Sequence, residues 1–331
     1  MGESLIQIIE KFGGSRIVVV GDIMIDCYTY GKINRLNPES AAPLITINDS
    51  QEDYRLGGAG NVALNARALG AKVDLYGAIG DDEDAGRICD MCKNYGINLI
   101  ACREGKTIKK QRFIERSPEK NNFHYLLRAD FGEENSKPLS DNGYELLFWE
   151  FMKRYSAYDG VILSDYNKKV LRGRLGREII ATTGEKRILT LVDPKPENDY
   201  SSFIGADIIR PNIHEARKIA GNNNLPIREL ALELKSKMRA KYSVISCGAE
   251  GLAIYADEFI HLPSKARNVV DVSGAGDTVA SALLLGLISG GDIIKAGRIA
   301  NYASGIVVEK QGTSYAGQKE LIERITSEKN D

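Results

Sequence analysis

The chain has 331 residues with 44 basic and 45 acidic side chains, so its formal net charge is −1 and it has no overall positive field with which to hold a polyanion. Its longest apolar stretches, such as residues 280–288, are far shorter than a bilayer span, and residues 1–22 lack the basic and apolar regions of a secretory signal. Its 5 cysteines, an odd number, favour reduced thiols. We therefore expect a cytoplasmic protein that binds neither nucleic acid nor membrane.

Short apolar runs alternate with stretches of helical spacing along most of the chain. The continuous apolar character of these runs indicates burial on both faces, as in a parallel sheet between two layers of helices. The pattern predicts an α/β, doubly wound, mainly parallel fold. The runs are residues 16–22, 72–80, 160–165, 188–194, 206–212 and 242–248.

Two segments break this alternation, Cys27–Ser50 and Thr107–Asp130. Both are rich in Thr, Tyr, Phe and Ile and alternate partly between polar and apolar residues, which is typical of antiparallel hairpins. We interpret them as a small β lid, inserted at about residues 27–50 and 104–130 into one domain that covers residues 1–331. The lid would also provide a face for a homodimer, because exposed strand edges need cover.

Polar residues follow several of the predicted strands: Asp22, Asp165, Asp193 and Asn212. The carboxyl ends of parallel strands form the ligand crevice of an open sheet, so these side chains are candidates for chemistry. For any one of them, the alternative is a turn or a helix cap.

Cys89 and Cys92 form a C-x-x-C pair. The apolar spacing around them predicts an amphipathic helix that ends at Gly96, and no second cysteine pair follows. We therefore expect neither a zinc site nor a redox site here.

The most specific local pattern is DVSGAGDT at residues 271–278, followed by an apolar run of helical length. Gly274, Ala275 and Gly276 are small enough for backbone N–H groups to converge on an anion at the start of that helix. Asp277 would repel a bound phosphate unless it accepts a proton from an attacking hydroxyl. The alternative is a first-turn acidic residue that only satisfies the helix dipole.

A second small-residue element, Gly57-Gly58-x-x-Asn61, offers close backbone approach and a side-chain amide for ligand hydroxyls. It follows the polar sequence QEDYR rather than a predicted strand, so it lacks the context of a dinucleotide-binding fingerprint. A Walker loop is also missing, because Ile100 stands where its first glycine should be. A tight turn into a helix is the structural alternative.

Together, Gly57-Gly58-x-x-Asn61 and DVSGAGDT resemble the signature elements of the ribokinase-like (PfkB) carbohydrate kinases, and the resemblance runs from Val18 to about Ser314. Within that family the chain is most similar to the D-glycero-β-D-manno-heptose 7-phosphate kinases. The segments that carry this similarity are residues 21–45, 163–171, 192–195, 210–216 and 309–314.

The resemblance implies an enzyme that uses ATP and Mg²⁺ to phosphorylate the anomeric hydroxyl of a heptose 7-phosphate, giving the 1,7-bisphosphate for ADP-heptose and lipopolysaccharide core synthesis. Other members of the family act on fructose 6-phosphate, tagatose 6-phosphate, ribose or a nucleoside, and these are the alternatives. A non-catalytic sugar or nucleotide sensor on the same fold is a further one. No His-x-Gly-His nucleotidyltransferase signature occurs in the chain, so we expect a separate protein for the adenylyl step.

The resemblance also implies roles for individual residues. Asp277 is the implied catalytic base, and the amides of Gly274, Ala275 and Gly276 form the implied anion hole. The implied sugar ligands are Asp26, Gly57, Gly58 and Asn61. The implied nucleotide and cation ligands are Lys195, Asn212 and Glu215 for the phosphates and, indirectly, Mg²⁺; Ser246, Gly248 and Gly251 for adenosine; Asn301 over adenine; and Asp271 and Ser273 for a monovalent cation such as K⁺.

Positive charge gathers in the second lid segment, where residues 103–128 contain eight Lys or Arg and three Glu. A lid with this bias can bind the phosphate of an already phosphorylated sugar. Lys110 and Arg112, two apart on one strand face, are the preferred ligands, and Lys168 and Arg35 are further candidates. The alternative is a solvated charged face.

Overall fold

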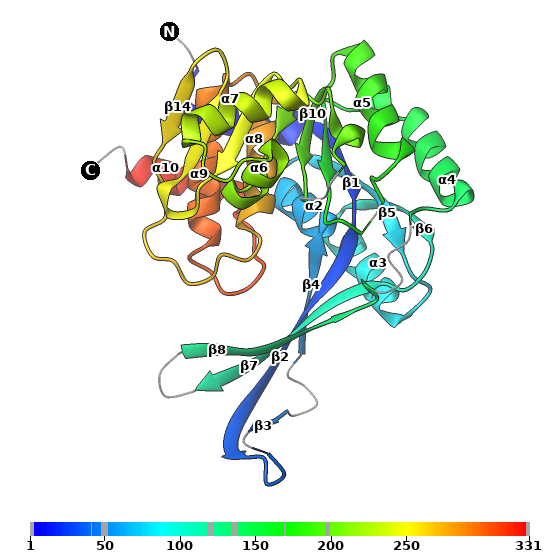
Figure 1. Ribbon diagram of the computed structural model, residues 1–331, viewed down its shortest axis with the longest axis vertical. Coiled ribbons are helices and arrows are strands. Elements are labelled where there is room, and N and C mark those ends of the chain that lie inside the picture. The colour runs from blue at the N-terminus through cyan, green and yellow to red at the C-terminus, as the bar shows by residue number, and fades with distance from the viewer. Residues whose placement is uncertain are drawn as a thin grey trace.

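The computed structural model describes residues 3–40, 42–47, 52–117, 122–133, 138–168, 170–195 and 199–328. Helices surround a large central sheet, and a second, smaller sheet projects from that body (Figure 1). Parts of both expected insertions, residues 41, 48–50 and 118–121, lie outside the described residues.

In the described part of the chain, the central sheet has nine strands in the order β14-β13-β12-β11-β10-β9-β1-β5-β6. The strands from β6 to β12 pair in parallel, and β13 and β14 are antiparallel additions at one edge. This confirms the predicted α/β, mainly parallel fold. The bounds are β1 Arg16–Gly21, β5 Lys72–Ile79, β6 Asn98–Arg103, β9 Gly160–Ser164, β10 Leu189–Asp193, β11 Ile208–Ile209, β12 Tyr242–Ser246, β13 Leu252–Tyr255 and β14 Phe259–Leu262.

Strand β1 shows why the apolar runs are continuous. Ile17 and Val19 are buried in the hydrophobic core on one face of the sheet, while Val18 and Val20 are buried in the core on the other. A strand covered on both faces has no solvated side on which polar residues would be favoured.

Helices cover both faces of the sheet, so the body has three layers. The first face is covered by α1 Leu5–Glu10, α2 Ala59–Ala68, α3 Glu83–Tyr95, α8 Ala275–Ile288, α9 Ile293–Val307 and α10 Gln318–Ser327. The second face is covered by α4 Asp141–Met152, α5 Arg174–Lys186, α6 Ile213–Ala220 and α7 Ile227–Met238. Short 3₁₀ turns lie at η1 Lys11–Gly14, η3 Tyr155–Ala157, η4 Ser201–Phe203 and η5 Gly248–Glu250.

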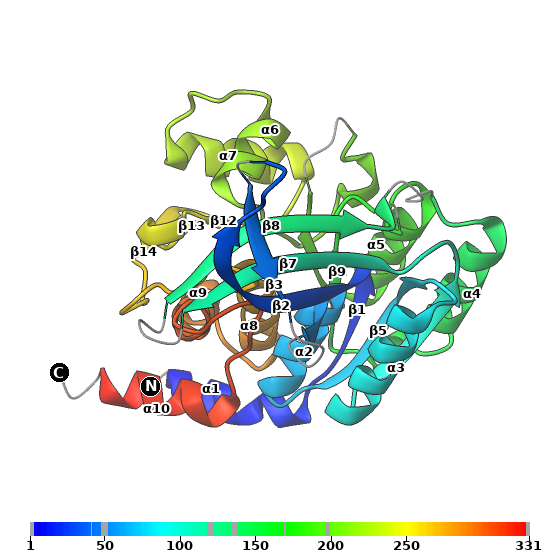
Figure 2. The ribbon, with the colours of Figure 1, turned by 90° about the horizontal axis from the view of Figure 1, so that it is seen from below.

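The smaller sheet, here called the lid sheet, contains five strands within the described residues: β2 Ile23–Leu36, β3 Pro43–Thr46, β4 Glu52–Gly58, β7 Ile108–Ser117 and β8 Asn122–Phe131. Strand β2 follows β1 across the single residue Asp22, so the lid sheet starts at the carboxyl end of a central strand. Seen from below, β2, β7 and β8 pass in front of the central sheet (Figure 2). The pairs β2–β3 and β7–β8 are antiparallel, as expected of two hairpins.

One expectation about this region is wrong. The polar sequence before Gly57 is part of a strand, β4, which pairs antiparallel with β2 from Ile23 to Thr29. Pairing with β2 satisfies the backbone of this segment whatever its side chains are, and the charged Arg55 is held by Asp53 and lies 4.8 Å over the Tyr28 ring. An antiparallel strand still lacks the parallel β-α-β context of a dinucleotide fingerprint.

The expected cysteine helix is α3, which Asp82 caps and Gly96 ends in the left-handed conformation with φ 69°. Cys89 and Cys92 are both free thiols on this helix. Within the described ranges, we find no helix with the length and apolar character needed to cross a membrane.

Candidate active site

Three of the four polar residues at the strand ends, Asp22, Asp165 and Asn212, accept backbone N–H groups, and the fourth, Asp193, pairs with a side chain instead. The Asp22 carboxylate accepts backbone N–H groups of Tyr166, Lys168 and Val170 at 2.8, 2.9 and 3.1 Å. Asp165 accepts the N–H of Asn167 at 2.9 Å. These two carboxylates fix the loop that follows β9, in agreement with the turn and capping alternative.

Asp277 occupies the first turn of α8 and is buried, with 4% of its surface exposed. Its Oδ2 accepts a hydrogen bond from Asn61 Nδ2 at 2.6 Å, and its Oδ1 accepts one from the Tyr166 hydroxyl at 2.5 Å. Burial raises the pKa of the Asp277 carboxyl, although these two hydrogen bonds and the charge of Arg210 oppose the rise. A buried carboxylate with a raised pKa is a stronger proton acceptor than an exposed one.

The start of α8 requires glycine at two positions. Gly274, the N-cap, has φ 81°, and a Cβ there would lie 2.7 Å from Asn61 Nδ2. A Cβ on Gly276 would lie 2.9 Å from Nη1 of Arg210. The first-turn N–H groups of a helix have no intrahelical partner, which makes this turn a site for an anion. Of the three amides predicted to form the anion hole, the Ala275 N–H is already used, because it donates to Val272 O at 3.2 Å.

The sugar ligands implied by the sequence gather beside Asp277. Asp26 on β2 is buried, and Gly57 is so close to it that a Cβ would lie 2.8 Å from Asp26 Oδ2. Gly58 caps α2 with φ 56°, which turns Asn61 toward Asp277. The structure therefore brings together Asp26, Gly57, Gly58, Asn61 and Asp277.

Two of the predicted lid cations reach this cluster from β7. Arg112 Nη1 forms an ion pair with Asp26 Oδ1 at 2.5 Å. Lys110 Nζ lies 5.1 Å from the centroid of the Tyr166 ring. Burial lowers the pKa of Lys110, and the positive charges of Arg128, Lys168 and Lys195 add to the effect against the opposing charge of Asp26.

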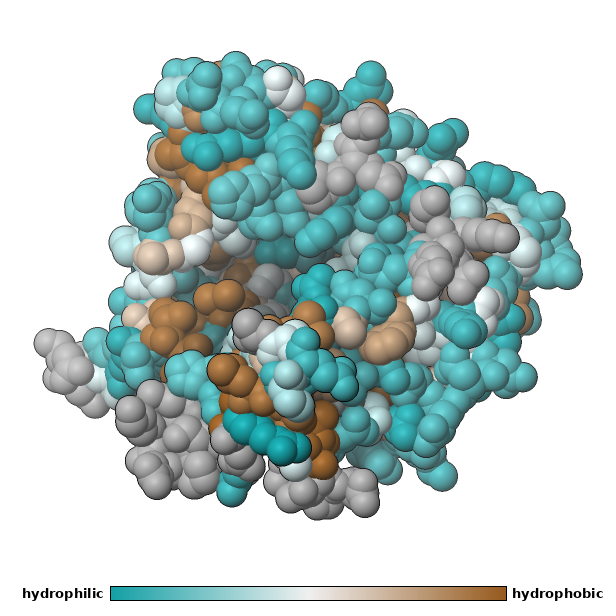
Figure 3. Space-filling model, turned by 60° about the horizontal axis from the view of Figure 1, so that its bottom comes forward, coloured by the Kyte–Doolittle hydropathy of each residue, from teal (hydrophilic) through white to brown (hydrophobic). Residues whose placement is uncertain are grey.

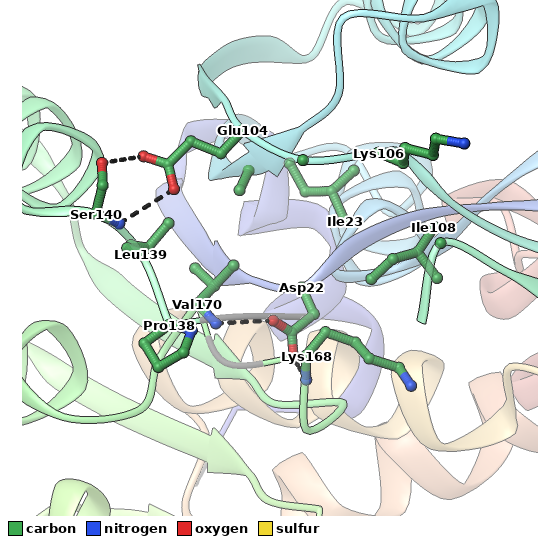
Figure 4. Close-up of a pocket in the computed structure, with 13 residues that line it drawn as sticks. Asp22, Ile23, Glu104, Lys106, Ile108, Pro138, Leu139, Ser140, Lys168 and Val170 are labelled. Atoms are coloured by element: carbon green, nitrogen blue, oxygen red, sulfur yellow. Dashed lines mark hydrogen bonds between the residues drawn. The ribbon is translucent and has the colours of Figure 1, made fainter. Parts of the chain in front are cut away.

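Lys168 and Asp22 both line a cavity of about 390 Å³. Figure 4 shows Asp22 accepting hydrogen bonds from the loop backbone. It also shows Glu104 hydrogen-bonded to Ser140 in another part of the cavity lining. Lys168 Nζ forms an ion pair with Glu133 at 2.5 Å, so one carboxylate already balances its positive charge.

Arg35 is the predicted sugar ligand that the fold does not bring to the cluster. It lies exposed near the outer end of β2, paired with Leu44 of β3. The nine residues that separate it from Asp26 span roughly 30 Å of strand. The sequence could not show this, because the length of β2 is set by its pairing with three neighbouring strands.

A second cavity, of about 260 Å³, lies on the opposite side of the α8 turn. Its lining is mostly apolar and includes the predicted nucleotide ligands Ser246, Gly248, Gly251 and Asn301, together with Gly276. The Asn301 amide is already engaged, since Nδ2 donates to Pro263 O at 2.6 Å and to Leu262 O at 3.3 Å. Asn301 therefore holds the loop after β14, which lines one side of this cavity.

The remaining predicted nucleotide ligands are Lys195, Asn212 and Glu215. Asn212 pairs with Ser246 of the cavity lining, and Lys195 lies over the same Tyr166 ring as the lid cation Lys110. Asn212 and Glu215 cap α6 reciprocally, with hydrogen bonds of 2.9 and 2.8 Å. The other Glu215 oxygen, Oε1, is 3.4 Å from Lys195 Nζ. Next to them, Asp193 forms a buried ion pair with Arg210, the residue that packs against Gly276.

Asp271 and Ser273, the candidate monovalent-cation ligands, shape the loop before α8. Asp271 Oδ1 accepts the Ser273 N–H at 2.9 Å, and Oδ2 accepts the Gly312 N–H at 2.9 Å and the hydroxyl of Tyr125 from the lid strand β8. Throughout the residues described, no group of three His, Cys, Asp or Glu side chains is arranged to hold a metal ion.

The mainly parallel sheet and the glycine-capped helix that carries Asp277 agree with one family. The model of the pfkB family carbohydrate kinases matches residues 15–320. The chain belongs to the pfkB family of carbohydrate kinases. This confirms the family and the enzyme class predicted from Gly57-Gly58-x-x-Asn61 and DVSGAGDT.

Relatives of this pfkB kinase cover nearly all of its length. It is 38% identical over 314 residues to the bifunctional protein HldE of Sulfurimonas denitrificans, covering 93% of this chain and 64% of the relative. It is 36% identical over 319 residues to the bifunctional protein HldE of Campylobacter curvus, covering 95% of this chain and 66% of the relative. The chain therefore spans less than two thirds of the length of these relatives.

Solved structures show the same fold at low identity. Arabidopsis thaliana ribokinase, complexed with ribose and ATP, superimposes with a TM-score of 0.68 at 16% identity, covering 94% of this chain and 98% of that one. Phosphofructokinase-2 of Escherichia coli, in complex with potassium, superimposes with a TM-score of 0.74 at 16% identity, covering 95% of this chain and 98% of that one.

Sequence reasoning about this pfkB kinase missed three side chains around the site. Tyr166 donates to Asp277, and the Thr313 hydroxyl donates to Asp26 at 2.9 Å while it is 2.8 Å from the Tyr28 hydroxyl. Two signals pointed to Tyr166: it directly follows the strand-ending Asp165, and it lies in segment 163–171, which carries the family similarity. Thr313 and Tyr28 are 285 residues apart, and no local pattern joins them.

Proposed function

We propose that this chain transfers the γ-phosphate of ATP to the anomeric hydroxyl of D-glycero-D-manno-heptose 7-phosphate and so forms the 1,7-bisphosphate used in ADP-heptose and lipopolysaccharide core synthesis. The observation that carries the proposal is the position of Asp277. Its buried carboxylate lies at the start of a glycine-capped helix, between the 260 Å³ cavity and the sugar-side cluster of Asp26 and Asn61.

The proposed reaction is an in-line phosphoryl transfer. The anomeric oxygen forms a bond to the γ-phosphorus while the bond from that phosphorus to the bridging oxygen breaks, and ADP leaves. Asp277 accepts the proton of the hydroxyl as the new bond forms. N–H groups of the Gly274–Asp277 turn then stabilise the charge on the transferring phosphoryl oxygens.

Mg²⁺ bound together with ATP would neutralise charge on the phosphates. Mg²⁺ usually keeps several waters and takes only one or two carboxylates from the protein, so a site without a three-residue cluster fits it. We propose Glu215 for this indirect role and Lys195 for the phosphates, supported by the 3.4 Å between Lys195 Nζ and Glu215 Oε1. A role of Asp271 and Ser273 in binding K⁺ remains part of the same proposal.

The charges at the lid support a phosphorylated acceptor. Lys110, Arg112 and Lys168 approach the crevice from β7 and from the loop after β9, and Lys110 is partly desolvated among other cations. Arg112 is paired with Asp26 and Lys168 with Glu133, so Lys110 is the cation that carries this argument. A sugar phosphate would supply negative charge to Lys110, whereas free ribose or a nucleoside would not. This favours a heptose 7-phosphate, with fructose 6-phosphate and tagatose 6-phosphate as the alternative acceptors.

The deciding experiment measures ADP release by the purified protein with heptose 7-phosphate, fructose 6-phosphate, tagatose 6-phosphate, ribose and adenosine. We expect the highest kcat/KM with heptose 7-phosphate. A higher kcat/KM with another acceptor would show that the proposed substrate is wrong and that the proposed kinase activity is right. No turnover with any of them would favour the non-catalytic sensor, which would still bind ATP or a sugar in calorimetry.

We further propose a homodimer formed through the lid sheet. Figure 3 looks toward the lid end of the molecule, where hydrophobic surface interrupts the hydrophilic surface. Exposed apolar side chains on the lid strands include Leu36, Tyr125, Leu126 and Leu127. Cover by a second copy would remove them from water and protect the strand edge of β8. Light scattering that finds only monomer at micromolar concentration would reject this part.

Two smaller parts of the proposal concern the setting of the reaction. The adenylyl step would be carried by a nucleotidyltransferase separate from this chain. We place the protein in the cytoplasm, supported by its five free cysteines, which suit a reducing compartment.

A further inference from the structure

Tyr166 lies at the centre of the site without an assigned role. Its hydroxyl donates to Oδ1 of Asp277 at 2.5 Å, while Asn61 donates to the other carboxylate oxygen at 2.6 Å. A carboxylate held by one donor on each oxygen cannot rotate about its terminal torsion without losing a hydrogen bond. Each oxygen keeps a further lone pair with which it can accept a proton.

The backbone of Tyr166 is itself held in place. Its N–H donates to Asp22 at 2.8 Å, and the backbone N–H groups of Lys168 and Val170 donate to the same carboxylate. On the other side, Asp165 forms an ion pair with Arg172 at 2.9 Å. The Tyr166 hydroxyl therefore projects from a loop that buried carboxylates fix to the ends of β1 and β9.

The face of the Tyr166 ring is also occupied. Nζ of Lys110, from the lid strand β7, lies 5.1 Å from the ring centroid, and Nζ of Lys195, from the end of β10, lies 5.9 Å from it. Cations at these distances are attracted by the ring. One aromatic ring thus contacts a cation from the sugar side and a cation from the nucleotide side.

We propose that Tyr166 is the positioning residue for Asp277: its hydroxyl orients the carboxylate toward the acceptor hydroxyl, and its ring sets the spacing of Lys110 and Lys195. This inference rests on the proposed role of Asp277 as the base. It adds a residue that acts through the base and through the two lysines rather than by touching the substrate.

The hydroxyl also affects how readily Asp277 holds a proton. The hydrogen bond from Tyr166 favours the ionised carboxylate and so lowers its pKa, against the larger effect of burial. Burial raises the pKa of Tyr166 itself, so its hydroxyl stays protonated and remains a donor. Besides Lys110 and Lys195 at the ring, the charges of Arg210, Asp26 and Asp193 also act on this pair.

The test is Tyr166→Phe, which removes the hydroxyl and keeps the ring. We expect kcat to fall about tenfold to a hundredfold, as for a misplaced catalytic group, while the KM values for ATP and sugar phosphate change less than about threefold. We also expect the acidic limb of the kcat/KM profile to move to higher pH, because the carboxylate loses a bond that favours its ionised form. Tyr166→Leu, which also removes the ring, should raise both KM values.

Tyr158→Phe is the matched control. The Tyr158 hydroxyl is buried and donates to a carboxylate, Asp74 Oδ2, at 2.6 Å. This pair lies at the amino ends of β9 and β5, away from the crevice. The variant should lose stability in urea unfolding and keep the wild-type pH profile.

Three outcomes would overturn the inference: a Tyr166→Phe variant with wild-type kcat, an unmoved acidic limb, or a change in the sugar KM alone, which would make Tyr166 a substrate ligand. The double variant Tyr166→Phe with Asp277→Asn should be no slower than Asp277→Asn alone. If Asp277→Asn keeps wild-type turnover, the proposed base is wrong. If it is inactive and Tyr166→Phe is normal, only the role of Tyr166 is wrong.

Discussion

Asn61 and Asp277 are 216 residues apart in the sequence and share a hydrogen bond of 2.6 Å. The bond joins the first turn of α2 to the first turn of α8, and both turns begin at a glycine with positive φ. The two sequence elements that identified the family are therefore two halves of one site. A sugar hydroxyl bound at Asn61 would lie beside the carboxylate that we propose as the base.

Replacement of Asp277 tests the proposed base most directly. Asp277→Asn keeps the size of the side chain and removes its ability to accept the hydroxyl proton. We expect kcat to fall by about 10²–10⁴, while ATP binding measured by calorimetry stays close to wild type. A variant that retains wild-type ADP release would show that Asp277 only caps the helix.

The pH profile should reflect two buried groups. Burial raises the pKa of Asp277, and the carboxylate must be ionised to act, so kcat/KM should fall as the pH is lowered through this raised value, above the range of an exposed aspartate. Burial lowers the pKa of Lys110, so binding of a sugar phosphate should weaken as the pH rises through a value below that of an exposed lysine. An acidic limb at the ordinary aspartate value would argue against Asp277.

Two adjacent lysines on β7 offer a matched test of the phosphate ligand. Lys110 faces the crevice beside Tyr166, whereas Lys109 forms an ion pair with Asp84 at 3.3 Å and lies over the Phe131 ring. Lys110→Met should raise the KM for the sugar phosphate about tenfold, the loss expected for one charge-assisted bond of roughly 1.5 kcal/mol. Lys109→Met should leave that KM unchanged, and equal effects would indicate a general charge effect of the lid.

A methyl group at the start of α8 should disturb the site. Gly276→Ala places a Cβ 2.9 Å from Arg210 Nη1, and Arg210 is held by its buried ion pair with Asp193. We expect a loss of about 1–3 kcal/mol in the free energy of unfolding and a lower kcat.

Gly184→Ala in α5 is the control, because a Cβ at Gly184 meets no atom within 4 Å. This variant should gain about 0.5–1 kcal/mol, as expected for alanine in place of glycine inside a helix. Both values would come from urea unfolding, with kcat from ADP release. A fully active Gly276→Ala variant would mean that Arg210 can move away from the added methyl group without disturbing the site.

Local chemistry made much of the fold predictable. Each of the six apolar runs lies on a strand of the central sheet, because a strand buried on both faces carries apolar residues at successive positions. The helix that begins at Ala275 and the αL glycine that ends α3 were also indicated by neighbouring residues. Strand β4 was missed because its polar residues are stabilised by pairing with β2, a partner that no local pattern reveals.

The sequence by itself determined the family and the small residues around Asp277, since both depend on short contiguous patterns. It also determined the α/β architecture, which follows from the alternation of apolar runs and helical stretches along the chain. Only the tertiary structure decided that Tyr166 contacts Asp277, that Lys110 rather than Lys109 faces the crevice, and that Arg35 lies about 30 Å along β2 from Asp26. These relationships depend on strand register and on how far each strand extends. Both are set by backbone pairing between segments far apart in the chain.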